Sequence, residues 1–322
     1  MMTAFIIGTG RCGSSLLAQM LNSHSKVCIP HELQILFEYS DNGGRLYELF
    51  ATGQNLDYVA ADFVALIKER CPHNFHDYFD YADFFSRQHY PILSLTTLAN
   101  DLFSAIAASR HKDFFIEQTP WYGQRLDILN SLFPEAKYLH IIRDGRDVAI
   151  SFARTPWWHS DIGDNLRRWD TEVRHIIAGA EQLLPPGQLL QVRYEDLVEQ
   201  PDTELRRICS FLGIDFENAL IDPSTFIDYG QYSTYNERAI SSASLNDWAK
   251  QKAQPTFKGS RYAWKKFTGF DFSKTPKDID QTLQALGYTT EMPRNYKKML
   301  LLAALKRYGK RLNRRLQRLI TS

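Results

Sequence analysis

A glycine-rich turn between two apolar runs constrains the fold of this chain more than any other feature. Residues 5–17 read FIIGTGRCGSSLL, which predicts a buried strand that turns into a helix near Ser14. Glycines let the backbone come close to an anion, and the free N–H groups at the start of the helix point toward it. The segment therefore predicts a phosphate-binding loop, made of Gly10, Arg11, Cys12, Gly13, Ser14 and Ser15.

Three kinds of turn fit this segment. Gly8, Gly10 and Gly13 match the dinucleotide-binding fingerprint, and Glu32 lies about 20 residues on, where a ribose-binding acid is expected. The spacing of Gly8 and Gly13 also resembles a Walker A loop, although Ser14 stands where that loop has a lysine. A tight turn without any ligand is the third possibility. The turn alone does not decide among them.

The composition is that of an ordinary globular protein, with 322 residues, of which 44% are hydrophobic and 23% charged. The sequence has no apolar stretch of membrane-spanning length and no signal peptide before the first expected strand, so we expect a cytoplasmic location. The cysteines at positions 12, 28, 71 and 209 match neither a zinc-site spacing nor a disulfide framework. No metal site is expected.

Strand-like runs alternate with helical stretches along most of the chain. The expected strands are 4–8, 26–29, 114–117, 137–143 and 188–193. This alternation predicts an α/β fold, with one domain over residues 1–292 built on a central parallel β-sheet flanked by helices. In such sheets ligands bind beyond the carboxyl ends of the strands.

The end of the chain differs in charge from the rest. Nine basic residues and no acidic one follow position 296, which leaves eight more acidic than basic residues in 1–296. Apolar residues recur every three or four positions, which predicts a basic amphipathic helix within 293–322; they are Leu301, Leu305, Tyr308, Leu312, Leu316 and Leu319. We favour a helix docked on the acidic remainder of the chain over contact with an anionic membrane surface or a partner. Nucleic-acid binding is disfavoured, because the acidic remainder repels phosphate.

Two further segments carry cations that suit a phosphate group. Residues 141–151 read IIRDGRDVAIS, so that a buried strand delivers Arg143 at its carboxyl end and Ser151 lies on the next helix. An Arg–Asp ion-pair network that caps this helix explains the segment equally well. Residues 257–265 read FKGSRYAWK, a basic segment that suits either a lid over a phosphate or a solvated loop.

Together these motifs resemble the sulfotransferases that use 3′-phosphoadenosine 5′-phosphosulfate (PAPS), in the form found in bacterial and Golgi-type members. The resemblance covers residues 4 to about 265 and implies a P-loop-like sulfotransferase fold. It implies that the glycine loop binds the 5′-phosphosulfate, with Arg11 as the catalytic basic residue. The other residues that it implies in nucleotide binding are Arg143 and Ser151 at the 3′-phosphate, Tyr194 at the adenine, and Lys258, Gly259 and Arg261 in the late basic segment.

The resemblance also implies the reaction. A sulfuryl group moves from PAPS to a hydroxyl or amine of an acceptor, without a metal ion, and adenosine 3′,5′-bisphosphate (PAP) is released. Glu32 resembles the glutamate base of the tyrosylprotein and carbohydrate branches, and we favour it over its neighbour His31. Gln118 and Pro120 stand where the cytosolic branch has a lysine and a base histidine, which excludes a histidine base there.

A small soluble metabolite is the favoured acceptor. Two other functions stay open from the sequence. A P-loop-type nucleotide kinase requires a loop lysine and magnesium ligands, and neither is visible in the sequence. A non-catalytic nucleotide-binding protein requires only the fold.

Overall fold

The computed structural model describes residues 2–30, 32–33, 36, 95–155, 158–226 and 261–320. The chain divides into two compact units, the first made of Met1–Arg143 with Glu172–Phe257 and the second of Asp144–Thr171 with Lys258–Ser322. The two longest segments outside the described residues are 37–94 and 227–260.

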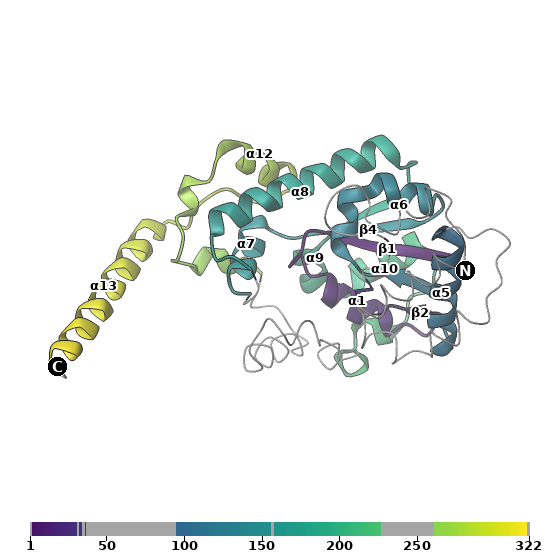
Figure 1. Ribbon diagram of the computed structural model, residues 1–322, viewed down its shortest axis with the longest axis horizontal. Coiled ribbons are helices and arrows are strands. Elements are labelled where there is room, and N and C mark those ends of the chain that lie inside the picture. Colours follow the sequence, from purple (N-terminus) through teal and green to yellow (C-terminus); the bar gives the residue numbers. More distant parts are fainter. Residues whose placement is uncertain are drawn as a thin grey trace, which may run out of the picture. The chain divides into compact units, whose positions relative to one another are not determined.

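A five-stranded sheet forms the centre of the first unit (Figure 1). The strand order is β2-β3-β1-β4-β5, and every pairing in the sheet is parallel. The strands are β1 (Met2–Gly8), β2 (Val27–Cys28), β3 (Phe114–Glu117), β4 (Lys137–Ile142) and β5 (Leu189–Arg193). This confirms the predicted α/β fold with a central parallel sheet.

Helices cover both faces of this sheet, because its strands carry apolar side chains on both sides. In β1, Phe5 and Ile7 belong to one buried cluster, which also contains side chains of α5 and α6. Ala4 and Ile6, which point the other way, belong to a second cluster with side chains of α1 and α10. The helical elements of the first unit are α1 (Ser14–Asn22), α5 (Leu95–Ser109), η1 (Pro120–Arg125), α6 (Leu126–Leu132), α9 (Tyr194–Glu199), α10 (Pro201–Leu212), η2 (Asn218–Ile221) and η3 (Pro223–Thr225).

The order of the strands predicts where a ligand binds. From β1 the chain passes to β2 and β3 on one side of it, and then crosses to β4 on the other. Ligands of open parallel sheets bind at the carboxyl ends of the strands where the order reverses in this way, here β1 and β4. Gly8 at the end of β1 pairs with Ile141, so the residues that follow the two strands begin side by side.

The second unit is helical in its described part. Its elements are α7 (Gly145–Ala153), η6 (Ala263–Lys266), η7 (Phe272–Lys274), α12 (Lys277–Ala285) and α13 (Tyr296–Ile320). Helix α8 (Ile162–Leu183) contributes residues to both units. Among the described residues, every helix is too short or too polar to cross a membrane.

Candidate functional site

The glycine loop connects β1 to α1, as the sequence predicts. Gly13 is the N-cap of α1 and has a φ of 103°, a backbone conformation that residues other than glycine rarely adopt. A Cβ atom at Gly13 would lie 2.3 Å from Cδ2 of Tyr194, and one at Gly8 would lie 2.6 Å from the carbonyl oxygen of Ile141. Both glycines are therefore required by close packing of the loop, against α9 and β4 respectively.

Arg11 and Arg143 meet at this loop. Nη1 of Arg143 donates a hydrogen bond to the carbonyl oxygen of Arg11 at 3.2 Å. The guanidinium carbon of Arg143 lies 4.5 Å from the centre of the Tyr194 ring, a cation–π contact. Arg11 itself has a φ of 64°, a left-handed conformation that costs about 1 kcal/mol or more for a residue with a side chain. The structure thus brings together Arg11, Gly13, Arg143 and Tyr194, which the sequence analysis selected from three separate motifs.

The charges at the loop favour an anion. Burial by surrounding protein atoms and, next, the positive charge of Arg143 lower the pKa of Arg11 to about 10. Arg11 is still protonated at neutral pH, so two positive charges lie near each other beside the N-terminus of α1. An anion bound between them would relieve their repulsion and would also accept from the free N–H groups of the helix.

The remaining loop residues differ in exposure. Ser14 is buried, and Nε2 of Gln118 donates a hydrogen bond to its Oγ at 3.4 Å, so the end of β3 contacts the loop. Ser15, the second residue of α1, is half-buried. Burial raises the pKa of the Cys12 thiol to about 11, which leaves it protonated and unreactive at neutral pH.

Glu32 lies within electrostatic range of this loop. Burial lowers the pKa of Arg11 and raises that of Glu117, and the negative charge of Glu32 partly offsets the first shift and adds to the second. His31, the alternative base, lies outside the described residues. The structure therefore places the favoured base near Arg11.

Glu117 is a buried carboxyl group that the sequence analysis did not select. Its Oε1 accepts hydrogen bonds from Oγ1 of Thr119 at 2.7 Å and from the backbone N–H of Leu33, next to Glu32, at 3.4 Å. Burial raises the pKa of Glu117, and the charge of Glu32 raises it further, to about 8. The signal in the sequence is an acidic residue that ends the otherwise apolar strand FFIE.

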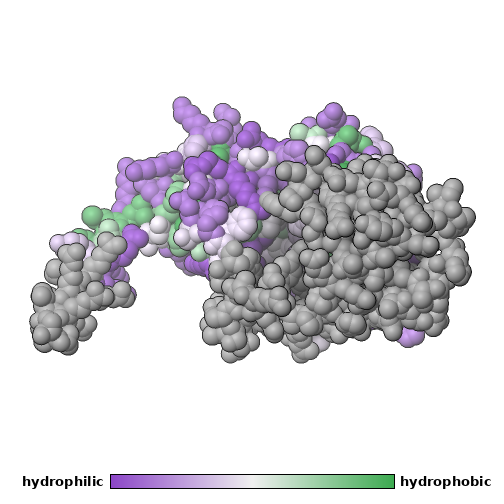
Figure 2. All heavy atoms as spheres, in the orientation of Figure 1, coloured by the Kyte–Doolittle hydropathy of each residue, from purple (hydrophilic) through white to green (hydrophobic). Residues whose placement is uncertain are grey.

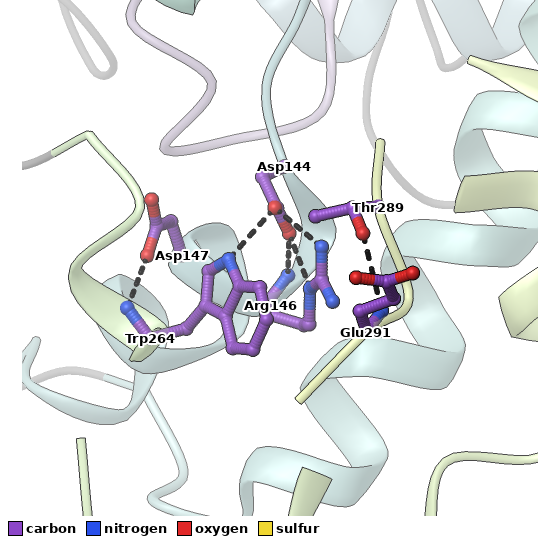
Figure 3. A network of polar contacts seen from close by, with 6 residues as sticks. All are labelled: Asp144, Arg146, Asp147, Trp264, Thr289 and Glu291. Atoms are coloured by element: carbon purple, nitrogen blue, oxygen red, sulfur yellow. Dashed lines mark hydrogen bonds and ion pairs between the residues drawn. The ribbon is translucent and has the colours of Figure 1, made fainter. Parts of the chain in front are cut away.

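The second unit contains the Arg–Asp network that was the alternative explanation of residues 141–151 (Figure 3). Asp144 is the N-cap of α7 and accepts from the backbone N–H of Arg146, and its carboxylate pairs with Arg146 Nε and Nη2 at 2.9 and 2.7 Å. Trp264 joins the same network, because its Nε1 donates to Asp144 at 2.9 Å and its backbone N–H to Asp147 at 2.8 Å. The network thus gives the capping role to Asp144 and an ion pair to Arg146, while the phosphate role of Arg143 stays a prediction.

The other predicted nucleotide-binding residues belong to the second unit. Ser151 lies on α7, and Arg261 is half-buried just before η6, the turn that carries Trp264. Lys258 and Gly259 lie outside the described residues. The pairing of Arg143 with Ser151 stays a prediction, because the two residues belong to different units. In the described part of the chain, no three His, Cys, Asp or Glu side chains are grouped as metal ligands.

The chain is similar to a family model and to several known proteins. The model of the sulfotransferase family matches residues 4–218. Nodulation protein NoeE of Sinorhizobium fredii is 25% identical over 270 residues, which are 76% of this chain and 59% of the relative. Protein-tyrosine sulfotransferase A of Caenorhabditis elegans is 24% identical over 314 residues, 91% of this chain and 69% of the relative. The chain spans less than two thirds of the length of NoeE and of two putative protein-tyrosine sulfotransferases of Caenorhabditis.

Two solved structures are similar over most of their length. The sulfotransferase domain of the Synechococcus PCC 7002 olefin synthase has a TM-score of 0.58 at 24% identity, covering 90% of this chain and 95% of that domain. The sulfotransferase domain of the curacin biosynthetic pathway has a TM-score of 0.58 at 25% identity, covering 91% of this chain and 98% of that domain. These likenesses agree with the α/β fold and the parallel sheet described above.

Proposed function

Because the chain belongs to the sulfotransferase family, we propose that it transfers a sulfuryl group from PAPS to a hydroxyl or amine of a small-molecule acceptor. The observation that supports this most is the hydrogen bond from Arg143 to the Arg11 carbonyl, because it holds two cations at one glycine loop. PAPS carries phosphate groups at the 3′ and 5′ positions of its ribose, and binding them requires cations of this kind.

The residues at the loop fit the proposed donor. Gly13 begins α1 in a left-handed conformation, and the N–H groups of the first turn of a helix favour an anion. Tyr194 is buried and packs against both Gly13 and Arg143, a position suited to an adenine contact. In this proposal the loop holds the 5′-phosphosulfate, and Arg143 binds the 3′-phosphate.

The chemistry needs alignment and charge more than covalent assistance. The acceptor oxygen or nitrogen attacks sulfur, the bond from sulfur to the 5′-phosphate oxygen breaks, and PAP leaves. Arg11, charged at neutral pH, offsets the negative charge that develops on that phosphate oxygen. The Glu32 carboxylate takes the proton of the acceptor, and its charge reaches Arg11, which places it on the side of the loop where this proton is lost.

The names of the relatives cover two kinds of acceptor. Several are named protein-tyrosine sulfotransferases, whereas Stf3 of Mycobacterium tuberculosis is named an omega-hydroxy-beta-dihydromenaquinone-9 sulfotransferase. We favour a small molecule, so a screen with labelled PAPS should include phenols, sugars, alcohols and amines, with a tyrosine peptide as the competing class. Transfer to the peptide alone would refute the small-molecule assignment.

Calorimetric titration tests the donor assignment directly. We expect the chain to bind PAP without a metal ion. Arg143→Ala should weaken PAP binding by ~10–100-fold, the effect of one lost charged hydrogen bond, and should change the affinity for adenosine 5′-phosphosulfate far less. Equal losses for both nucleotides would refute the 3′-phosphate role of Arg143. A magnesium-dependent thermal shift with ATP, and none with PAP, would support a kinase instead.

A further inference from the structure

Helix α13 (Tyr296–Ile320) carries apolar side chains that the other described residues leave exposed. Leu301, Leu305 and Tyr308 are 61%, 58% and 69% exposed. Figure 2 shows hydrophobic residues at the surface of the first part of this helix, at the left of the view. Single exposed leucines are common on proteins, but these three follow one another at intervals of four and three, which places them on one face of the helix.

The sequence continues this face to the end of the helix. Leu312, Leu316 and Leu319 keep the same intervals, and at about 100° per residue all six apolar positions fall within an arc of roughly 80°. Of the nine basic positions from Lys297 onward, only Lys298, in the first turn, falls within that arc. The helix therefore carries one apolar face over a length of about 37 Å, and the other eight basic positions lie outside that face.

We propose that α13 binds an anionic lipid surface and lies in its plane. Leucines on one face would enter the boundary between headgroups and acyl chains, and lysine and arginine on the flanks would meet lipid phosphates. The basic residues make this helix too polar to cross the membrane, so it lies on the surface rather than spanning the bilayer.

The charge pattern favours lipid over a protein partner. Helices that pair with other helices commonly carry charges of both signs beside the apolar face, because those charges select the partner and its register. Residues 297–322 contain no acidic residue at all, so every charge on the polar face attracts an anionic surface. Residues 1–296 carry an excess of acidic residues, so such a surface repels them and α13 would supply the attraction.

Vesicle flotation of the full chain tests the proposal. We expect ~10-fold or more binding to vesicles with about 30% phosphatidylserine over pure phosphatidylcholine. Raising NaCl from about 0.1 M to about 0.5 M should release most of the protein. Equal binding to both vesicles, or none to either, would overturn the proposal.

Variants separate the two faces of α13. Lys297→Gln with Lys298→Gln and Arg315→Gln, the three basic positions nearest the apolar face, should remove most of the preference for phosphatidylserine. Leu305→Gln with Leu312→Gln should abolish binding while it keeps all basic residues and a good helix former at each site. The control is the double variant Lys274→Gln with Lys277→Gln, which removes two exposed lysines of the same unit outside α13. This variant should bind the vesicles as the unchanged chain does.

Two other outcomes would replace lipid by a different occupant. A dimer in sedimentation that the leucine variant disrupts, without vesicle binding, would assign the apolar face to a second copy of the chain. Slow hydrogen exchange of residues 301–312 in the monomer, again without vesicle binding, would assign it to the chain itself. PAP affinity in solution should be unchanged in every α13 variant, so failure of this proposal is distinguishable from failure of the proposed reaction.

Discussion

The guanidinium group of Arg146 lies over the indole ring of Trp264, with its Cζ 3.6 Å from the ring centre, and the same guanidinium pairs with Asp144. Arg146, Asp144 and Trp264 are each at most 1% exposed. This buried network fixes the turn η6, which begins within the late basic segment, to the start of α7, which carries Ser151. The late basic segment and the helix that carries Ser151 are thus joined within the second unit.

Loss of Arg146 should be costly. Arg146→Leu leaves the Asp144 carboxylate buried without its cation, and we expect the free energy of unfolding to fall by about 3–5 kcal/mol. Arg167→Leu is the matched control, because the Arg167–Asp164 pair is exposed on both sides and should contribute at most about 1 kcal/mol. Urea unfolding of the two variants measures the difference. Equal, small losses would show that the buried pair does not stabilise the second unit.

Substitution of Gly13 should disrupt the loop far more than its backbone conformation alone explains. Gly13→Ala adds a Cβ atom that clashes with Tyr194, in addition to the left-handed φ. Gly187→Ala is the control, because Gly187 has a φ of 89° but no neighbouring atom within 4 Å of the added Cβ. We expect the control to lose about 1 kcal/mol of stability, and Gly13→Ala to lose more and to bind PAP poorly. The double variant Gly13→Ala with Tyr194→Ala should recover part of the stability if the clash is the cause.

Glu117 makes stability depend on pH. Burial raises its pKa from 4.5 to about 8, so between these values the folded chain keeps a proton that the unfolded chain has lost. The contribution of Glu117 to the free energy of unfolding is therefore fully present below pH 4.5. It falls as the pH rises toward 8, by at most about 1.4 kcal/mol per pH unit. Glu117→Gln, which stays neutral, should remove this decline relative to the unchanged chain. Urea unfolding between pH 5 and pH 8 measures it, and the exposed Glu181→Gln should leave the slope unchanged.

Arg11→Ala should act on turnover more than on binding. Removing a donor that offsets charge in the transition state costs roughly 100-fold or more in turnover. Arg11→Lys keeps the charge and should recover part of the rate. Steady-state kinetics with labelled PAPS and the best acceptor of the screen measure both variants. A fall in PAPS affinity that accounts for the whole loss would make Arg11 a binding residue only.

Glu32→Gln should retain PAP affinity and lose turnover, because the amide cannot accept the acceptor proton. The neighbouring His31→Gln serves as the comparison, since His31 is the alternative base. Kinetics on both variants decide between them. Unchanged turnover in Glu32→Gln would remove Glu32 from the mechanism.

The parts of the fold that depend on local pattern were predictable from the sequence. The apolar run before Gly8 and the run that ends at Ile142 are buried strands, because both faces of a parallel sheet are covered and every position can be apolar. The glycine loop was predictable for a related reason, since its backbone demands recur at fixed spacing.

The parts that depend on distant partners were not predictable. The pKa of Glu117 depends on burial and on Glu32, 85 positions away in the sequence, and no local pattern reports that proximity. Trp264 belongs to a basic segment in the sequence, yet it is fully buried against Asp144 and Arg146. Likewise, nothing near Gly13 announces the ring of Tyr194 that excludes a side chain there.

The central position of β1 in the sheet has a consequence for how the chain folds during its synthesis. β1 is synthesised well before its two neighbours in the sheet, β3 and β4, which end at Glu117 and Ile142. Tyr194, which packs against the loop after β1, follows later still. A nascent chain that ends before β3 and β4 therefore holds an apolar strand without its hydrogen-bonding partners, the state in which aggregation is favoured and chaperones are needed. β1 thus acquires its native surroundings only after more than a hundred further residues have been added.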